Sequence, residues 1–373
     1  MQPPLAFEPP RRVLMGPGPS LVAPSVYEAM ARPLIGHLDP EFVRLMEEIK
    51  GMLRAVFLTD NAMTFPVSGT GSAGMEFCLG NLIEPGDEVV VGVNGVFGGR
   101  MAEVAARLGA RVIRVEAEWG RIIEPDEVAS ALGATRQPKL VAVVQAETST
   151  GAWTPVEEIA RVAHQAGALM VVDAVTSLGG CPVRVDAWGL DAVYSGTQKC
   201  LSAPPGLAPV TLSERALDVA RKRRTKVSSW YFDVNLLASY WGEERVYHHT
   251  APISMNYALH EALRLVLLEG LEARWERHRL HHEILREGLA ARGLALTAQD
   301  GHRLWQLNAV AVPKGVDEAA VRKALLIDHG IEIGAGLGPL KGKVWRIGLM
   351  GETSRAAPIE ALMQALDQIL PSR

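Results

Sequence analysis

The region from about Thr64 to Leu212 repeats one pattern, in which a short apolar run is followed by a stretch with helical periodicity. The apolar runs are EVVVGV (88–93), RVIRVE (111–116), KLVAVVQ (139–145), ALMVVD (168–173) and DAVYSG (191–196). Strands that alternate with helices in this way form a mostly parallel sheet covered by helices on both faces. The sequence therefore predicts an α/β fold. Its most clearly marked helix begins near Pro155, with Thr154 as the expected cap.

The rest of the chain predicts a second, smaller domain, because 373 residues exceed what one small core accommodates. Residues 254–292 are rich in Leu, Glu, Arg and His and are expected to form one long connecting helix. Strand and helix patterns then alternate over 293–373, which predicts a small α+β C-terminal domain. Residues 21–253 make up the expected large domain, and residues 1–20 precede it as an expected N-terminal arm.

Composition and charge limit the possible partners and compartments. A formal net charge of −4 gives no reason to expect nucleic acid or an anionic membrane as a partner. No apolar run reaches the roughly 20 residues of a membrane helix. The first residues, MQPPLAFEPPRR, lack the apolar stretch of a signal peptide, and the last four, LPSR, are not a peroxisomal signal. Three cysteines without metal-like spacing complete the expectation of a cytoplasmic protein.

The segment Gly69-Thr-Gly71-Ser-Ala-Gly74 matches the dinucleotide-binding pattern G-x-G-x-x-G. That fingerprint also needs an acidic residue at the end of the next strand, where this chain has Asn94-Gly95. The motif also lies some 60 residues into the chain, whereas the fingerprint normally opens its domain. We therefore interpret it as a turn whose backbone N–H groups can hold a single phosphate at the start of a helix.

Three features fall at the carboxyl ends of expected strands, where open α/β sheets bind their ligands. They are the phosphate-type loop at 68–74, Asp173 at the end of an apolar strand, and Lys199 in the stiff stretch YSGTQKCLSAPPGLAP. Separately, Asp173 is also compatible with a turn or helix cap, and Lys199 with a surface lysine. Together, a phosphate anchor, a carboxylate for a ring nitrogen and a lysine for an aldehyde indicate pyridoxal 5′-phosphate.

The sequence gives no comparable support for a metal site. His278 and His282 are four residues apart on the expected connecting helix, a spacing that can bind zinc. No third ligand is evident, and Arg and Glu residues surround the pair. We therefore expect these histidines on a solvated helix face and no bound metal.

Eight motifs that match the pattern of one protein family are spread over nearly the whole chain. They are GPGPS (16–20), SGTGSAG (68–74), NGVFGGR (94–100), ETSTG (147–151), VVDAVTSLGG (171–180), YSGTQK (194–199), YHHTAP (247–252) and GKVWRIGLMG (342–351). With them the sequence resembles the class V aminotransferases of fold type I, in particular the alanine–glyoxylate and serine–pyruvate group. The resemblance implies pyridoxal 5′-phosphate as cofactor and a large domain with a seven-stranded, mostly parallel sheet.

The resemblance also implies roles for individual residues around the cofactor. Lys199 would bond to the cofactor aldehyde, and Asp173 would pair with the ring nitrogen. Phe97 would stack on the ring, where close relatives carry Trp, and Thr148 would hydrogen-bond near the ring hydroxyl, where relatives have Ser. The residues implied in phosphate binding are Thr70, Gly71, Ser72 and Gln198.

Further residues are implied in substrate binding and in assembly. Arg346 would bind the substrate carboxylate through its bidentate guanidinium. Gly18 and Pro19 would belong to a rigid wall beside the substrate. Tyr247 and Thr250 would reach the phosphate of the neighbouring subunit, so the resemblance implies a homodimer with shared active sites. Ser72 stands where the animal enzymes have His, so their substrate preference does not carry over closely.

We expect transamination between a small amino acid, alanine or serine, and a small 2-oxo acid, glyoxylate or pyruvate. Alternative donors are aspartate, an aminophosphonate or pyridoxamine. A fold type I lyase or desulfurase is a further alternative, but it needs a nucleophilic cysteine in the C-terminal half, and no cysteine follows Cys200. A dinucleotide-dependent oxidoreductase and a binding protein without cofactor represent other classes, and the intact Lys199, Asp173 and Arg346 argue against the latter.

Overall fold

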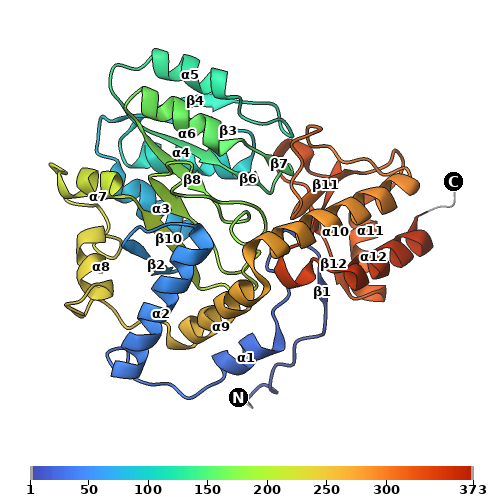
Figure 1. Ribbon diagram of the computed structural model, residues 1–373. Coiled ribbons are helices and arrows are strands. Elements are labelled where there is room, and N and C mark those ends of the chain that lie inside the picture. Colours follow the sequence, from blue (N-terminus) through green and yellow to red (C-terminus); the bar gives the residue numbers. More distant parts are fainter. Residues whose placement is uncertain (1–2, 371–373) are drawn as a thin grey trace.

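A seven-stranded sheet forms the centre of the large domain in the computed structural model, which describes residues 3–370 (Figure 1). β10 is antiparallel to both of its neighbours and the other pairings are parallel. The predicted α/β fold and sheet are thereby confirmed. In spatial order the strands are β2 (Met63–Ser68), β10 (Leu207–Leu212), β9 (Ala192–Tyr194), β8 (Leu169–Asp173), β5 (Pro138–Val144), β3 (Glu88–Val93) and β4 (Arg111–Glu116).

Helices cover both faces of this sheet because alternate strand residues point to opposite sides. Val89 and Val91 of β3 pack into one hydrophobic cluster, whereas Val90 packs into the other. The first cluster includes α3 (Gly71–Leu82), α4 (Val96–Arg107), α7 (Glu214–Arg221) and α8 (Val234–Trp241). The second includes α5 (Pro125–Gly133) and α6 (Val156–Gln165), while α2 (Pro40–Phe57) and α9 (Ile253–Glu269) contribute to both.

The start of α6 differs from the prediction. Pro155, not Thr154, occupies the N-cap position, and no side chain caps this helix. The Thr154 hydroxyl is buried and has no hydrogen-bond partner among residues 3–370. The sequence pattern located the helix correctly, but the backbone turns one residue later than the cap rule indicates.

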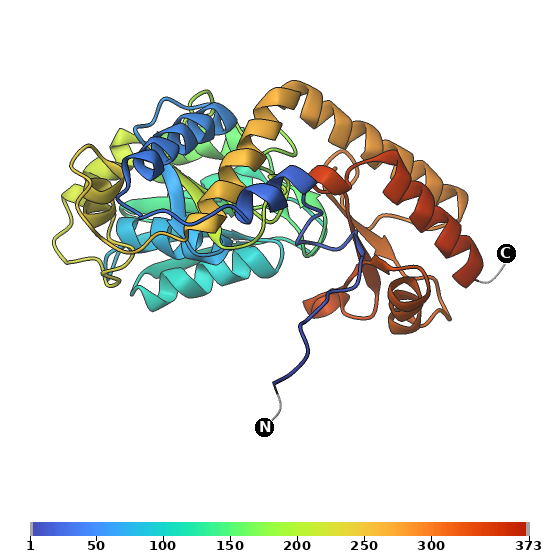
Figure 2. The same cartoon turned by 90° about the horizontal axis from the view of Figure 1, so that it is seen from below.

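The segment between the domains consists of two helices instead of one. α9 ends at Gly270, and α10 (Leu271–Ala291) begins directly after it. Gly270 has a φ of 83°, a left-handed conformation that glycine adopts readily, so the helix axis changes direction there. The expectation of a single connecting helix over 254–292 is therefore wrong. Figure 2 shows the two helices arching from the large domain to the small one.

The two histidines of α10 are buried, which contradicts the expected solvated face. His278 Nδ1 lies 2.7 Å from the Arg274 carbonyl oxygen, and its Nε2 accepts from the Gly351 amide. Burial, followed by the nearby Arg274 charge, lowers the pKa of His278 to about 3. Nδ1 of His282 lies 2.8 Å from Asn308 Oδ1. Both rings thus join α10 to the small domain, and the described residues contain no cluster suited to a metal ion.

The small domain has a three-stranded sheet of order β11 (Leu307–Ala311), β14 (Val344–Gly348) and β13 (Gly334–Ala335). Helices α10, α11 (Glu318–Asp328) and α12 (Ala356–Ile369) pack around its core. The N-terminal strand β1 (Val13–Leu14) pairs in parallel with β12 (Ile331–Glu332). The first strand of the chain thus belongs to the small domain, whereas the next element, α1 (Pro24–Met30), packs on α9.

The remaining elements are short. They are the hairpin of β6 (Ala146–Glu147) and β7 (Ala152–Trp153) and the 3-10 turns η1 (Gly338–Leu340) and η2 (Gly351–Thr353). Residues 1–2 of the expected arm, and residues 371–373 of the expected C-terminal domain and of LPSR, lie outside the described residues. No helix within residues 3–370 is long and apolar enough to cross a bilayer.

Candidate active site

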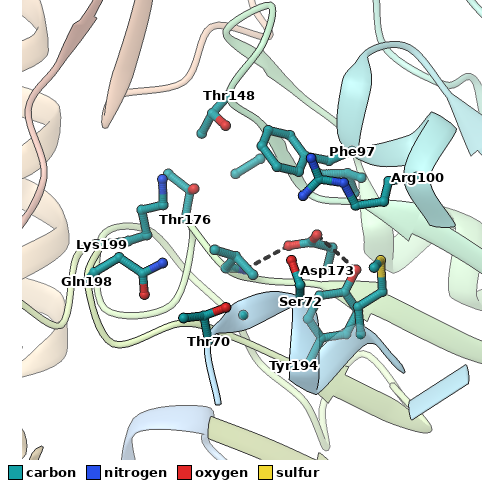
Figure 3. A pocket seen from close by; sticks show the side chains of 15 residues that line it. Thr70, Ser72, Phe97, Arg100, Thr148, Asp173, Thr176, Tyr194, Gln198 and Lys199 are labelled. Carbon is teal, nitrogen blue, oxygen red and sulfur yellow. Dashed lines mark hydrogen bonds between the residues drawn. The ribbon is translucent and has the colours of Figure 1, made fainter. Parts of the chain in front are cut away.

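A cavity of about 150 Å³ lies at the edge of the sheet where the parallel strands end (Figure 3). The predicted residues that line it are Thr70, Gly71, Ser72, Phe97, Thr148, Asp173, Gln198 and Lys199. Seven lining residues had no predicted role, namely Met75, Arg100, Val144, Ala146, Val175, Thr176 and Tyr194. Five predicted residues do not line this cavity, namely Gly18, Pro19, Tyr247, Thr250 and Arg346.

Lys199 lies in the loop that follows β9, with its side chain directed into the cavity. Its Nζ donates a hydrogen bond to the carbonyl oxygen of Pro17. The hydroxyl of Ser20 donates to the Lys199 carbonyl at 2.7 Å, and the Ser20 amide donates to the Gln198 carbonyl at 2.9 Å. Burial lowers the pKa of Lys199 to about 8, and the Arg346 charge acts in the same direction. The N-terminal arm thus clamps the lysine loop.

Asp173 is the last residue of β8 and is 5% exposed. Its Oδ1 accepts from the Val175 amide at 2.8 Å, and its Oδ2 accepts from the Tyr194 hydroxyl at 2.8 Å. Burial raises the pKa of Asp173 to about 6, and the charge of Glu147 adds to the rise, whereas the two hydrogen bonds oppose it. A carboxylate held in this way is suited to share a proton with a basic ring nitrogen.

The loop Gly69–Gly71 leads from β2 into α3, and Thr70 is the N-cap of that helix without a side-chain cap bond. Its hydroxyl, and that of Ser72, are therefore available to a ligand at the helix N-terminus. The amide oxygen of Gln198 is buried and has no hydrogen-bond partner within the described residues. A buried amide atom without a partner is uncommon and indicates a ligand that completes its bonding.

Phe97, in the first turn of α4, and Thr148, in the turn after β6, lie on the opposite side of the cavity from Gln198 (Figure 3). The guanidinium carbon of Arg100 lies 5.1 Å from the centre of the Phe97 ring. Cations near an aromatic face are attracted by its electrons, so Arg100 packs over this ring. Phe97 and Arg100 both line the cavity.

Arg346 is on β14 of the small domain and is 7% exposed. Its Nε donates to the Ala335 carbonyl at 2.6 Å, and its Nη1 donates to the Thr148 carbonyl at 3.2 Å. Within the described residues it forms no ion pair. Burial lowers its pKa, and the negative charge of Glu147 partly offsets the effect. A buried guanidinium without an ionic partner is suited to bind an anionic group of a small ligand.

The N-terminal arm lies against Lys199 at Pro17 and Gly18, where a wall beside the substrate is predicted. Gly18 has a φ of 107°, and a Cβ at this position would lie 2.6 Å from Lys199 Nζ. Only glycine therefore allows the backbone to approach the lysine this closely. Pro19 follows it directly, so this part of the wall is short of flexible side chains.

Tyr247 and Thr250 are exposed on the segment between α8 and α9, and neither lines the cavity of its own chain. The Tyr247 ring lies 5.2 Å from the ring of His37 and remains 59% exposed. The expectation that these two residues reach a neighbouring subunit stays a prediction.

The sequence analysis assigned no role to Tyr194 or Glu147, although each lies inside a quoted motif. Tyr194 lies opposite Asp173 in the β8–β9 register, and a strand alignment would have indicated this contact. Glu147 opens the motif ETSTG, is fully buried and does not line the cavity. Nothing in its local sequence distinguishes it from an exposed turn residue.

A model of the aminotransferase class-V family matches residues 24–350. The chain belongs to this family. The resemblance stated from the motifs is thereby confirmed, and so is the expectation of an aminotransferase. The alternative function of a dinucleotide-dependent oxidoreductase is thereby excluded.

Individual relatives of this class V aminotransferase are similar over almost their whole length. The (S)-ureidoglycine–glyoxylate transaminase of Bacillus subtilis is 42% identical over 379 residues, which cover 97% of this chain and 91% of the relative. The alanine–glyoxylate aminotransferase of Drosophila melanogaster is 39% identical over 368 residues, covering 97% and 93%. A crystal structure of alanine–glyoxylate aminotransferase from Nostoc sp. has a TM-score of 0.97 and 49% identity, covering 99% and 98%.

Proposed function

We propose that this aminotransferase binds pyridoxal 5′-phosphate in the cavity and transfers an amino group from a small amino acid to a small 2-oxo acid. One observation carries the proposal: Lys199, with a pKa lowered by burial, and the buried carboxylate of Asp173 line the same cavity. When bound, the cofactor supplies an aldehyde that takes up the amino group and a ring that draws electrons from the substrate's α-carbon.

The residues of the cavity fit this cofactor. The amide groups at the start of α3, with the hydroxyls of Thr70 and Ser72, form a donor set suited to a phosphate. Gln198 lines the same cavity, its amide oxygen is buried and without a partner within the described residues, and its NH₂ group can donate to an anion there. Phe97 offers a flat apolar surface to a ring, and Asp173 a carboxylate to its nitrogen.

The chain's own groups perform the proton transfers. With a pKa of about 8, a fraction of Lys199 is unprotonated near neutral pH, and its Nζ would take the proton from the substrate's α-carbon and deliver it to the carbon of the former aldehyde. The carboxylate of Asp173 keeps a proton on the ring nitrogen, helped by the Tyr194 and Val175 bonds that fix its orientation. Arg346 binds the substrate carboxylate and excludes other orientations of the substrate.

Gly18 and Pro19 support a small substrate. They have no bulky, flexible side chains, and the backbone at Gly18 approaches Lys199 closely, which favours small amino acids such as alanine or serine. The names of both curated relatives include glyoxylate, which supports glyoxylate as the acceptor here. A second candidate donor is (S)-ureidoglycine, because the relative named for it is 42% identical.

A desulfurase activity finds no support in the cysteines. Cys200 is fully buried, and its Sγ lies 3.1 Å from the Thr176 carbonyl oxygen. Burial raises its pKa to about 12, so the thiolate needed for attack on sulfur is not available near neutral pH.

A homodimer with shared sites belongs to the same proposal. Tyr247 and Thr250 of one subunit would complete the phosphate site of its partner. Exposed apolar side chains near this segment support a covered surface, because Trp230 is 62% exposed and stacks on His248 with 4.4 Å between ring centres. We also propose that the enzyme works in the cytoplasm, in keeping with its reduced, buried cysteines.

The test is a half-reaction screen of the purified protein with pyridoxal 5′-phosphate. Alanine, serine, (S)-ureidoglycine and aspartate are each added alone, and conversion of the cofactor to its amine form is followed by absorbance. Glyoxylate or pyruvate is then added to measure the return. We expect alanine or serine to convert the cofactor and glyoxylate to restore it. Borohydride should fix the cofactor on Lys199 by mass spectrometry, and a Lys199→Ala protein with normal turnover would refute the proposal.

A further inference from the structure

Glu147 is a carboxylate with no ionic partner in the interior of the described protein. It is 0% exposed, it ends the short strand β6, and it forms no ion pair within residues 3–370. Burying such a group is costly unless hydrogen bonds compensate for the lost water. Its position therefore needs a physical explanation beyond packing.

Both oxygens of Glu147 accept hydrogen bonds from outside their own strand. Oε2 accepts from the backbone amides of Phe97, at 3.1 Å, and Gly98, at 3.3 Å. Oε1 accepts from the Ser149 amide at 3.1 Å and from its hydroxyl at 2.6 Å. The Ser149 hydroxyl oxygen in turn accepts from the Val96 amide at 3.0 Å. Glu147 and Ser149 thus bind three successive amides of the first turn of α4.

These contacts replace a local cap. The N-cap residue of α4 is Gly95, which has no side chain to accept from the first turn. A Cβ at Gly95 would lie 2.4 Å from Glu147 Cδ and 2.4 Å from Ser149 Oγ, so the carboxylate occupies the space of a cap side chain. Because the first amides of a helix need acceptors, the position of this turn depends on the buried carboxylate.

The turn that Glu147 fixes carries Phe97, the ring that borders the cavity. We propose that Glu147 is a positioning residue, whose carboxylate fixes the first turn of α4 and thereby holds the Phe97 ring at the cofactor site. The inference rests on the proposed function for the identity of the ligand. It does not rest on that function for the contact between Glu147 and α4.

The test uses Glu147→Gln, which preserves the shape of the side chain but has one acceptor oxygen instead of two. In either orientation the NH₂ group then faces donors, either the α4 amides or Ser149. We expect amide hydrogen exchange in residues 96–98 to accelerate, and the dissociation constant for pyridoxal 5′-phosphate to rise roughly 10- to 100-fold. The visible circular dichroism of the bound cofactor should weaken, since it reports how the ring is held.

Glu158→Gln is the matched control, because Glu158 is an exposed carboxylate in the first turn of α6. It should leave all three measurements unchanged. Phe97→Leu tests the route of the effect. If Glu147 acts through Phe97, Glu147→Gln should change the dissociation constant little in the Phe97→Leu background. Additive effects of the two substitutions on that constant would overturn the inference.

Other outcomes separate the inference from the proposed function. Failure of the wild-type protein to bind the cofactor would refute the proposed function, and hydrogen exchange would still test the Glu147 contact with α4. Normal exchange and normal cofactor binding in Glu147→Gln would refute the inference alone. Should that variant not fold, Ser149→Ala removes one donor to Oε1 and the acceptor for Val96. It should produce the same three changes, with a dissociation constant raised roughly 3- to 10-fold. Unchanged values in all three measurements would count against the inference.

Discussion

The Tyr194 hydroxyl donates to Oδ2 of Asp173 at 2.8 Å, across neighbouring strands in which the two residues are directly opposite. Both groups are buried, and burial followed by the Asp173 charge raises the pKa of Tyr194 well above its usual value. The phenol therefore stays protonated and remains a donor at every physiological pH. Asp173 keeps one fixed orientation as a result, with its other oxygen bound to the Val175 amide.

Asp173→Asn should make the cofactor-free protein more stable while abolishing transamination. The pKa of Asp173 is raised to about 6, so the folded protein holds its proton more tightly than the unfolded chain does between about pH 4 and 6. Stability is therefore lost as the pH rises through this window. Above it, the asparagine variant should be more stable by roughly 2–3 kcal/mol. Urea unfolding at pH 4, 6 and 8 measures the difference, which should shrink toward pH 4.

Tyr194→Phe should lower the stability of the cofactor-free protein, whereas Asp173→Asn should raise it. It removes a hydrogen bond that favours the charged form of Asp173, so the pKa of Asp173 should rise further. The cofactor-free variant should lose about 1–2 kcal/mol of stability at pH 8, and less at pH 4, where the carboxyl is neutral. Equal losses at the two pH values, measured by the same urea method, would contradict this account of the pair.

Gly18→Ala should reduce turnover at least tenfold without unfolding the protein. The new Cβ would lie 2.6 Å from Lys199 Nζ at a φ of 107°, so the lysine side chain must move. The strained backbone adds a stability cost of about 1 kcal/mol. Gly51→Ala is the control, since its Cβ would meet no atom within 4 Å. Steady-state kinetics and thermal unfolding are measured together, and normal turnover in Gly18→Ala would mean that the wall does not constrain the lysine.

Arg346→Ala should raise KM for the amino donor and for the oxo acid alike. The loss of a buried charged partner costs about 2–4 kcal/mol, which corresponds to roughly 30- to 1000-fold. Arg279→Ala serves as a control, because the Arg279 side chain is partly exposed and forms an ion pair only with Glu276 among the described residues. A KM that changes for one substrate alone would assign Arg346 to something other than the shared carboxylate.

Mixing Lys199→Ala and Tyr247→Ala subunits tests whether sites are shared. If Tyr247 completes the partner's site, a mixed dimer contains one site with both residues intact and one with neither. Mixtures refolded together should then recover activity that neither variant shows alone, up to about a quarter of the wild-type value when subunits pair at random. Absence of recovery in a mixture that gel filtration and mass spectrometry identify as dimeric would place Tyr247 outside the partner's site.

The sequence predicted those features that depend on local pattern. Alternating apolar residues predicted the sheet, and strand ends predicted where Asp173 and Lys199 would meet. It did not predict the break at Gly270, because a single glycine within a long helical pattern is often tolerated. The burial of His278 depends on the Gly351 amide, which comes from a turn far along the chain.

Glu147 shows a second limit of sequence reasoning. Acidic residues in turns are usually exposed, and no periodicity identifies one whose acceptors serve a helix 50 residues earlier. The roles proposed for Tyr247 and Thr250 would involve a second copy of the chain. Local patterns in the sequence thus predict candidate catalytic residues, whereas contacts between residues distant in the sequence become evident only in the folded structure.

The pairing of β1 with β12 constrains how the enzyme is made in the cell. Pro17 and Gly18, which contact Lys199, follow the strand Val13–Leu14, and that strand has its partner only at Ile331–Glu332. The ribosome therefore releases the arm long before its partner strand exists, and a nascent large domain carries an incomplete active site. Closing so long a loop has an entropic cost that grows slowly with length, so the arm can dock last. Catalytic competence should accordingly appear only after the chain has left the ribosome, and no earlier fragment should have it.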